Sequence, residues 1–144
     1  MSLSGEAETV VMREPSTGRG TWSMGSLFEH LLEAAPGQAQ IGVAIVTQPP
    51  GTATPLHRHT REAEAFYLLD GLMEYVAGED HYDLYAGCFI RLPAGLPHAF
   101  RVRGDEPVRF LAIAEPGNLL HLYDEVGIPA TELRLPGDDG QTME

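Results

Sequence analysis

Apolar residues recur with a helical period in the first quarter of the chain and with an extended period from about residue 40 onward. Four of the apolar residues before residue 40 share one helical face: Leu27, Phe28, Leu31 and Leu32. Ser26 precedes them as an N-cap and the pair Pro36-Gly37 follows as a stop, so this pattern predicts a short helix. The β-branched stretch 9–13 predicts a short edge strand ahead of it.

Seven short extended segments follow, and turn residues separate each one from the next. They cover residues 40–48, 64–70, 72–78, 81–85, 88–92, 99–103 and 108–114. Short strands at such close intervals, punctuated by Gly, Pro and Asp, indicate an antiparallel sandwich or barrel. A second short helix is expected over 118–127, before a polar tail.

The length of 144 residues is most simply that of one fold. We divide the chain into an N-terminal arm with a short strand and helix (1–37), a barrel (38–116) and a C-terminal short helix with a tail (117–144). No apolar run reaches the ~18 residues of a membrane span, and the first ten residues lack the character of a signal peptide. We therefore expect a cytoplasmic protein without membrane partners.

Charge narrows the class of ligand. The chain carries 21 acidic and 9 basic residues, a formal net charge of -12. Such a surface repels nucleic acid and anionic bilayers, so the expected partner is a small molecule. All nine basic residues are arginine. The absence of lysine excludes Schiff-base and pyridoxal-phosphate chemistry and a P-loop nucleotide site, since each needs the lysine amine.

Two histidines and a carboxylate form the first candidate site. One residue separates His57 from His59, so both imidazoles of an extended segment point to the same side. Glu64 follows after enough chain for a reversal, which would return a carboxylate to the same place. Glu62 shares the parity of Glu64 and competes with it, although a side chain in the turn more often faces solvent or supports a ligand. The remaining histidines other than His98 lack a spaced partner and are expected to be structural or solvent-exposed: His30, His81 and His121.

A fourth ligand candidate, His98, follows a tight turn that Pro93 and Gly95 shape. The first spacing runs through Gly51, His57, His59, Glu64 and Gly71, separated by five, one, four and six residues. The second runs through Gly87, Pro93, Gly95 and His98, separated by five, one and two residues. Together they resemble the two sequence motifs of the cupin superfamily. Val102 stands where the second motif usually ends in Asn, a departure that removes no metal ligand.

The resemblance covers roughly residues 20–130. Over this range the chain is similar to small single-domain cupins of the quercetin-dioxygenase-like type. It implies an all-β fold, a double-stranded β-helix or jelly-roll barrel with short flanking helices. It also implies one divalent metal ion held by His57, His59, Glu64 and His98. Five- or six-coordinate Fe, Mn, Ni, Co or Cu would keep a position open for substrate or dioxygen, whereas these four ligands would saturate a tetrahedral Zn.

The activity that the resemblance implies is that of a metal-dependent dioxygenase acting on a small aromatic or enol substrate. Glu64 or Glu62 would be the base that takes a hydroxyl proton. Five apolar residues on or beside the ligand strands are candidates for the substrate pocket: Phe66, Leu68, Met73, Tyr75 and Phe100.

Two other functions stay open at this stage. One is a non-catalytic module that binds a metal or a small molecule. The other, less favoured, is a sugar isomerase or epimerase, because phosphate usually attracts lysine or a basic cluster and only Arg58 and Arg61 lie near the site. The resemblance further implies a homodimer, in which the stretch 9–13 pairs with a sheet edge of a second copy.

Overall fold

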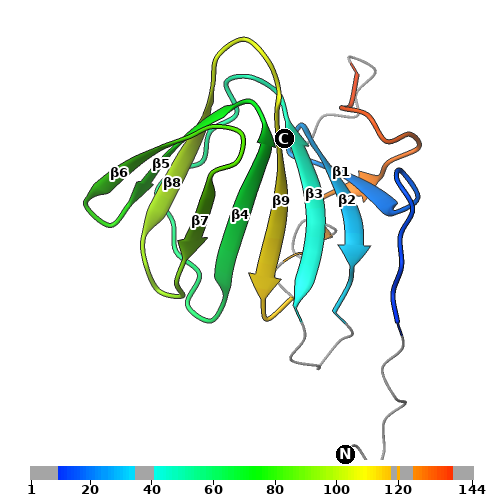
Figure 1. The fold of residues 1–144 in the computed structure, drawn as a ribbon, viewed down its shortest axis with the longest axis horizontal. Helices are drawn as coiled ribbons and strands as arrows, with labels where there is room; N and C mark the ends of the chain where they lie inside the picture. Colours follow the sequence, from blue (N-terminus) through cyan, green and yellow to red (C-terminus); the bar gives the residue numbers. More distant parts are fainter. Residues whose placement is uncertain (1–9, 35–40, 118–119, 121–124, 138–144) are drawn as a thin grey trace, which may run out of the picture.

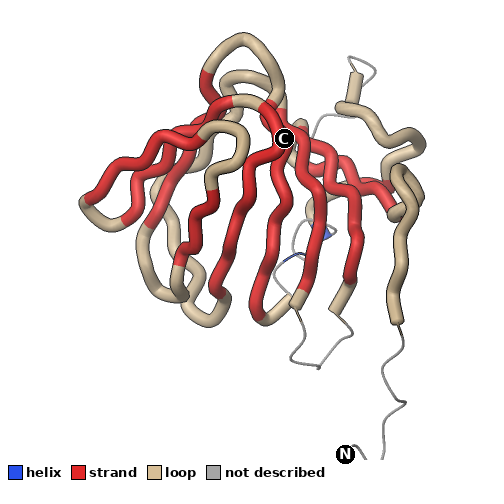
Figure 2. Tube along the Cα trace, viewed as in Figure 1, coloured by secondary structure: helices blue, strands red, loops and turns tan. Residues whose placement is uncertain are grey.

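A seven-stranded and a three-stranded antiparallel sheet make up the fold (Figures 1 and 2). The computed structural model describes residues 10–34, 41–117, 120 and 125–137. The strands are β1 (Arg19–Ser23), β2 (Ser26–Leu32), β3 (Gly42–Gln48), β4 (Ala63–Asp70), β5 (Leu72–Ala77), β6 (Asp80–Leu84), β7 (Phe89–Leu92), β8 (His98–Arg103), β9 (Val108–Glu115) and β10 (Ile128–Pro129). The larger sheet has the order β10-β1-β2-β3-β9-β4-β7, and the smaller has the order β6-β5-β8.

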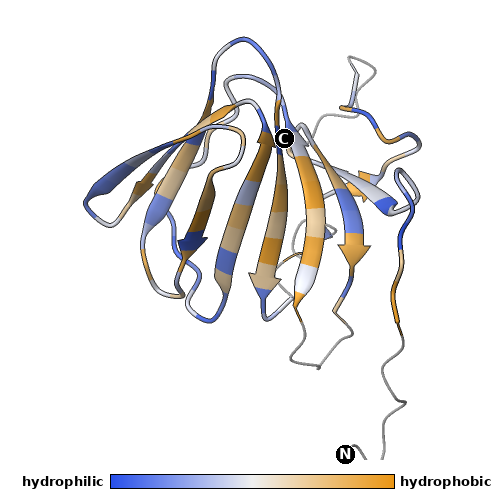
Figure 3. Cartoon of the chain, viewed as in Figure 1, coloured by the Kyte–Doolittle hydropathy of each residue, from blue (hydrophilic) through white to orange (hydrophobic). Residues whose placement is uncertain are grey.

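The hydrophobic core lies between the two sheets and draws on both. Along β3 and β9, every second residue is buried, as expected for strands with one face on a core. Figure 3 shows these two strands mostly in hydrophobic colours, whereas β6 at the edge of the smaller sheet is largely hydrophilic. Phe66 and Phe110 from the larger sheet meet Tyr75 from the smaller one in a single buried cluster. The all-β barrel fold expected from the strand pattern is therefore confirmed.

All seven strands expected between residues 40 and 114 are present, as β3 to β9. Their alternation could be recognised because each has one face on the core and one toward the surface. Among the described residues, there is no helix with the length and apolarity that crossing a membrane requires.

The helix predicted to begin at Ser26 is wrong, because Ser26–Leu32 is strand β2. Five consecutive residues of β2 are buried, from Ser26 to His30, so both faces of the strand are covered there. A strand buried on both faces has no alternation, and its continuous apolar run mimics a helical face. The end of the predicted helix, from residue 35 onward, lies outside the described residues.

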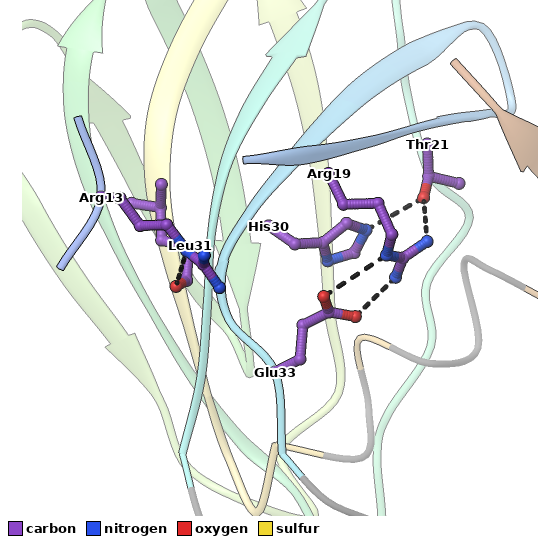
Figure 4. A network of polar contacts seen from close by, with 6 residues as sticks. All are labelled: Arg13, Arg19, Thr21, His30, Leu31 and Glu33. Atoms are coloured by element: carbon purple, nitrogen blue, oxygen red, sulfur yellow. Dashed lines mark hydrogen bonds and ion pairs between the residues drawn. The ribbon is translucent and has the colours of Figure 1, made fainter. Parts of the chain in front are cut away.

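The edge strand predicted at 9–13 is also wrong for its described part. Residues 10–13 form no strand, and Val10 and Met12 are 94% and 72% exposed. Arg13 nevertheless holds this segment to the sheet, because its Nε donates to the carbonyl of Leu31 at 3.1 Å (Figure 4).

Strand β1 is an element that the sequence pattern missed, since Gly20 within it and the glycines on either side of it indicate turns. Figure 4 shows the polar network that joins it to β2. His30 is buried, and its Nε2 lies 3.0 Å from the hydroxyl of Thr21. Arg19 contacts the same hydroxyl at 3.4 Å and pairs with Glu33 at 2.6 Å. His30 is thus a structural histidine, although it lies on a strand rather than on a helix.

The chain after β9 returns to pair with the edge of β1 that does not face β2. Strand β10 pairs with β1, and the indole Nε1 of Trp22 donates to the carbonyl of Arg134 at 2.7 Å. The second short helix predicted over 118–127 falls mostly outside the described residues, of which Leu120 and Glu125 have helical conformation. The division of the chain at residues 37 and 116 stays a prediction, although β1 and β2 pair into the same sheet as β3.

Candidate metal centre

The histidines proposed as ligands come from two segments that the backbone joins directly. His57 and His98 form an antiparallel bridge, in which each amide donates to the other's carbonyl at 2.9 and 2.8 Å. Residues directly opposite in such a pair project to the same face. The amide of Gly95 donates to the carbonyl of His59 at 2.7 Å. The turn before His98 therefore holds the loop that carries His57 and His59, which is not a regular strand.

The three imidazoles converge. Ring centroids lie 4.4 Å apart for His57 and His98, 5.2 Å for His57 and His59, and 5.7 Å for His59 and His98. One nitrogen from each ring lies within 4.8 Å of the others. Donor atoms bound to a common ion at ~2.1 Å lie roughly 3–4 Å apart. Small side-chain movements are enough to bring these nitrogens to that spacing.

Backbone carbonyls set the tautomer of two of these rings. Nδ1 of His57 lies 2.8 Å from the carbonyl oxygen of Pro55, and Nδ1 of His98 lies 3.0 Å from that of Leu96. A carbonyl oxygen only accepts, so each Nδ1 carries the proton and donates it. Each Nε2 is then left with its lone pair available, which is the usual arrangement of a metal-binding histidine.

Glu64 brings the carboxylate that the motif spacing predicts. It is 8% exposed, and its Oε2 lies 3.4 Å from Nε2 of His98 and 3.7 Å from Nε2 of His59. Burial disfavours the charged form of His98, but the Glu64 carboxylate and the Leu96 carbonyl outweigh this effect and raise the pKa of His98.

The donor set fits a divalent metal ion. Nε2 of His59 is buried and has no hydrogen-bond partner among the described residues. A buried nitrogen without a partner costs stability, and a metal ion would satisfy it. Three neutral imidazoles and one carboxylate are ligands that Fe, Mn, Co, Ni, Cu and Zn all accept.

The competing carboxylate lies outside the cavity lining, and its role as a base stays a prediction. Glu62 lies just before β4 and is half-buried, but it does not line the cavity beside the imidazoles. Glu64 does line that cavity, together with His57 and His98. Side-chain alternation therefore directs Glu64, which lies within β4, toward the cavity, but it does not apply to Glu62, which precedes the strand.

The cavity beside the imidazoles has a volume of about 130 Å³. Of the five residues predicted for a substrate pocket, Phe66, Tyr75 and Phe100 line it. Leu68 and Met73 are instead fully buried in the core, 0% and 1% exposed, and are not part of the lining. Substrate contact by any of the five stays a prediction.

Other lining residues were not found from the sequence. Two are aromatic, Phe28 and Phe110, and five are polar: Ser23, Ser26, Gln48, Thr52 and Thr54. The parity of β3 was a signal for Gln48, because it places this residue on the same inward face as Val46. Ser23 and Phe28 had no such signal, since β1 and β2 were not recognised as strands.

A second group with metal-binding side chains lies outside this cavity. Glu74, His81 and Asp83 of the smaller sheet offer atoms within 4.8 Å of one another. However, Glu74 already pairs with Arg103 at 2.5 Å and with Arg101 at 3.4 Å. Desolvation opposes ionisation, but the two arginines and His81 outweigh it and lower the pKa of Glu74. The negative charge here is neutralised, so we assign no metal to this group.

Comparison with known proteins agrees with the motif spacing. The family model described as "Cupin domain" matches residues 44–114, which run from β3 to β9 and contain all four proposed ligands. The chain is a small cupin. A curated relative of this cupin is quercetin 2,3-dioxygenase of Bacillus subtilis, 31% identical over 131 residues, which are 88% of this chain and 34% of that protein. Auxin-binding protein 1 of Arabidopsis thaliana is 28% identical over 109 residues, 69% of this chain and 54% of that protein.

This cupin thus spans about a third to a half of the length of these curated relatives. Among solved structures, a predicted oxalate decarboxylase from Thermotoga maritima superimposes with a TM-score of 0.62 at 23% identity, over 75% of this chain and 99% of that one. A likeness at this identity supports the barrel fold alone.

Proposed function

We propose that this cupin binds one divalent metal through His57, His59, Glu64 and His98 and acts as a dioxygenase on a small aromatic or enol substrate. The observation that carries the proposal is the convergence of three imidazoles and a buried carboxylate at one end of a cavity lined by aromatic rings. The likeness to a quercetin 2,3-dioxygenase supports the choice of reaction.

The size of the cavity favours a substrate with a single ring. A cavity of ~150 Å³ in another protein holds one benzene molecule, and the cavity here measures about 130 Å³. A flavonol with three rings would extend well beyond it. Single-ring catechols and enediols match both the volume and the aromatic walls.

The residues of this chain have distinct roles in the proposed reaction. A bound metal ion would supply a Lewis acid that favours the deprotonated form of the substrate hydroxyl. Oε2 of Glu64 faces His59 and His98, which leaves Oε1 to accept the hydroxyl proton. The rings of Phe66, Tyr75 and Phe100 exclude water from the bound substrate.

Oxygen consumption tests the proposal. The metal-loaded protein is expected to consume dioxygen with at least one member of a panel of single-ring catechols and enediols, and protein stripped by a chelator is expected to consume none. Because both oxygen atoms enter the substrate in such a reaction, no external reductant is added. Metal bound without any uptake across the panel would instead favour the non-catalytic binding module.

A sugar-phosphate isomerase has less support. Arg58 and Arg61, the basic residues nearest to the motif, are exposed and do not line the cavity. No arginine is among the described residues of its lining. A phosphate group would therefore find no cationic partner inside.

Metal retention should depend on pH. Imidazole must be neutral to bind a metal, and Glu64 and Leu96 raise the pKa of His98, so protonation of this ring begins earlier on acidification than at its ordinary value of ~6.5. We expect full metal content after dialysis at pH 7.5 and loss of nearly all metal at pH 4. Elemental analysis of the two samples is the measurement, and equal content would contradict the assigned histidine ligands.

We also propose that the protein is a homodimer in which a second copy covers the segment 10–13. Val10 and Met12 are 94% and 72% exposed, an unfavourable state for neighbouring apolar side chains. Light scattering on the V10S/M12S double variant is expected to give the mass of a monomer and on the unchanged protein that of a dimer. A dimeric double variant would remove this segment from the interface.

A further inference from the structure

The cavity has a second polar end, away from the imidazoles. Gln48 is 7% exposed and Ser23 is 0% exposed, and both line the cavity. Oε1 of Gln48 and Oγ of Ser23 are buried and have no hydrogen-bond partner among the described residues. A buried polar atom without a partner is destabilising, so its retention points to a partner that binds there.

The two ends of the cavity lie at different levels of the barrel. Gln48, at the end of β3, lies opposite Val108 on β9. Glu64, which faces His98 in the metal centre, lies opposite Ala114 on the same strand. Six residues of β9 separate these two levels, roughly 20 Å along the strand.

The chemistry of the second end selects the group it binds. An amide oxygen accepts a hydrogen bond, and a serine hydroxyl can donate or accept. The absence of arginine from the described lining argues against a carboxylate or phosphate at this end. A neutral hydroxyl group suits both partners, because it donates to Gln48 and accepts from Ser23.

We propose that Gln48 and Ser23 recognise a neutral hydroxyl on the far side of a single-ring substrate whose metal-binding oxygens lie beside His57, Glu64 and His98. The rings of Phe66, Phe110 and Tyr75 enclose the apolar middle of such a molecule. The assignment rests on the proposed function for the metal-binding end, whereas the second end has its own evidence in the two unpartnered atoms.

Thermal unfolding of the ligand-free protein tests the second end without any substrate. A Gln48 retained for a ligand contributes little to stability, so Gln48→Met is expected to leave Tm unchanged or to raise it by up to ~4 °C. A fall of more than ~4 °C in Gln48→Met would show that the amide is structural and would overturn the proposal, while leaving the metal site untouched.

Ligand binding tests recognition directly. The probes are 4-methylcatechol and 4-(hydroxymethyl)catechol, titrated into the metal-loaded protein under argon in a calorimeter. We expect the hydroxymethyl compound to bind ~10-fold more tightly to the unchanged protein, as one satisfied buried hydrogen bond predicts. Gln48→Met is expected to abolish this preference and to keep the affinity for 4-methylcatechol within ~2-fold.

The matched control is Thr47→Val, because Thr47 is the neighbour of Gln48 on the outward parity of β3. This variant is expected to retain the ~10-fold preference. Equal binding of the two probes to the unchanged protein, or a preference that survives Gln48→Met, would overturn the assignment. Failure of both probes to bind would count against the aromatic substrate of the proposed function, and the Tm of Gln48→Met would then decide the role of Gln48.

Discussion

Replacing His98 by alanine is expected to remove the metal and the dioxygen uptake together. His98 is 3% exposed, its Nδ1 donates to the Leu96 carbonyl, and its Nε2 faces Glu64 at 3.4 Å. Loss of residues that merely support a ligand lowers metal affinity ~10–100-fold, so loss of a ligand should lower it by ~100-fold or more. Elemental analysis after gel filtration and an oxygen electrode measure the two effects.

His81→Ala is the matched control, because it removes an imidazole from the same sheet without touching the cavity. His81 is about half exposed and pairs with Glu74 on the outer face. This variant should keep both the metal and the uptake. A His98→Ala protein that folds, as judged by circular dichroism, and still carries one metal per chain would refute the assigned centre.

Gly71→Ala should be among the most destabilising single substitutions in the described part of the chain. Gly71 joins β4 to β5 with a φ of 91°, and a Cβ there would lie 2.8 Å from both the carbonyl oxygen of Pro107 and Cα of Val108. The left-handed backbone costs about 1–2 kcal/mol for a residue with a Cβ, and overpacking adds about 1–3 kcal/mol. We expect a loss of about 3 kcal/mol and a fall in Tm of roughly 10 °C.

Gly95→Ala separates the two contributions. Gly95 has a similar φ of 84°, but nothing lies within 4 Å of the position of its Cβ. This variant carries the backbone strain alone, about 1–2 kcal/mol. Urea unfolding of both variants gives the comparison. Equal losses would show that the close approach of Gly71 to β9 has no energetic weight.

The motif spacing anticipated where the donor atoms gather because it encodes local geometry. The turn at Gly95 and the parity of Glu64 each restrict where a side chain can point, whereas His57 and His59 lie on a loop that its contacts with His98 and Gly95 hold in place. The bridge between His57 and His98 then brings the two motifs together. Glu62 could not be separated from Glu64 by parity, because the point at which β4 begins depends on its pairing with β7 and β9.

The prediction from hydrophobic periodicity failed for β2, most of which is buried. The spacing of Leu27, Phe28 and Leu31 predicts a helical face, yet these residues lie on β2, in which five consecutive residues are buried. Hydrophobic periodicity arises when one face of an element is exposed to solvent, so an element that is buried on both faces shows no periodic pattern. Strand β1 and its Ser23 were missed for another reason, because the glycines around Trp22 indicate turns.

The sequence by itself determined the strands from β3 to β9 and the candidate metal ligands, because both follow from side-chain alternation and from turn geometry over short stretches. Only the tertiary structure decided the shape of the cavity, since its walls come from strands far apart in the chain. Gln48 and Ser23 line the same cavity because β1, β2 and β3 lie side by side in one sheet. Such pairing depends on burial across the whole fold, which local pattern does not record.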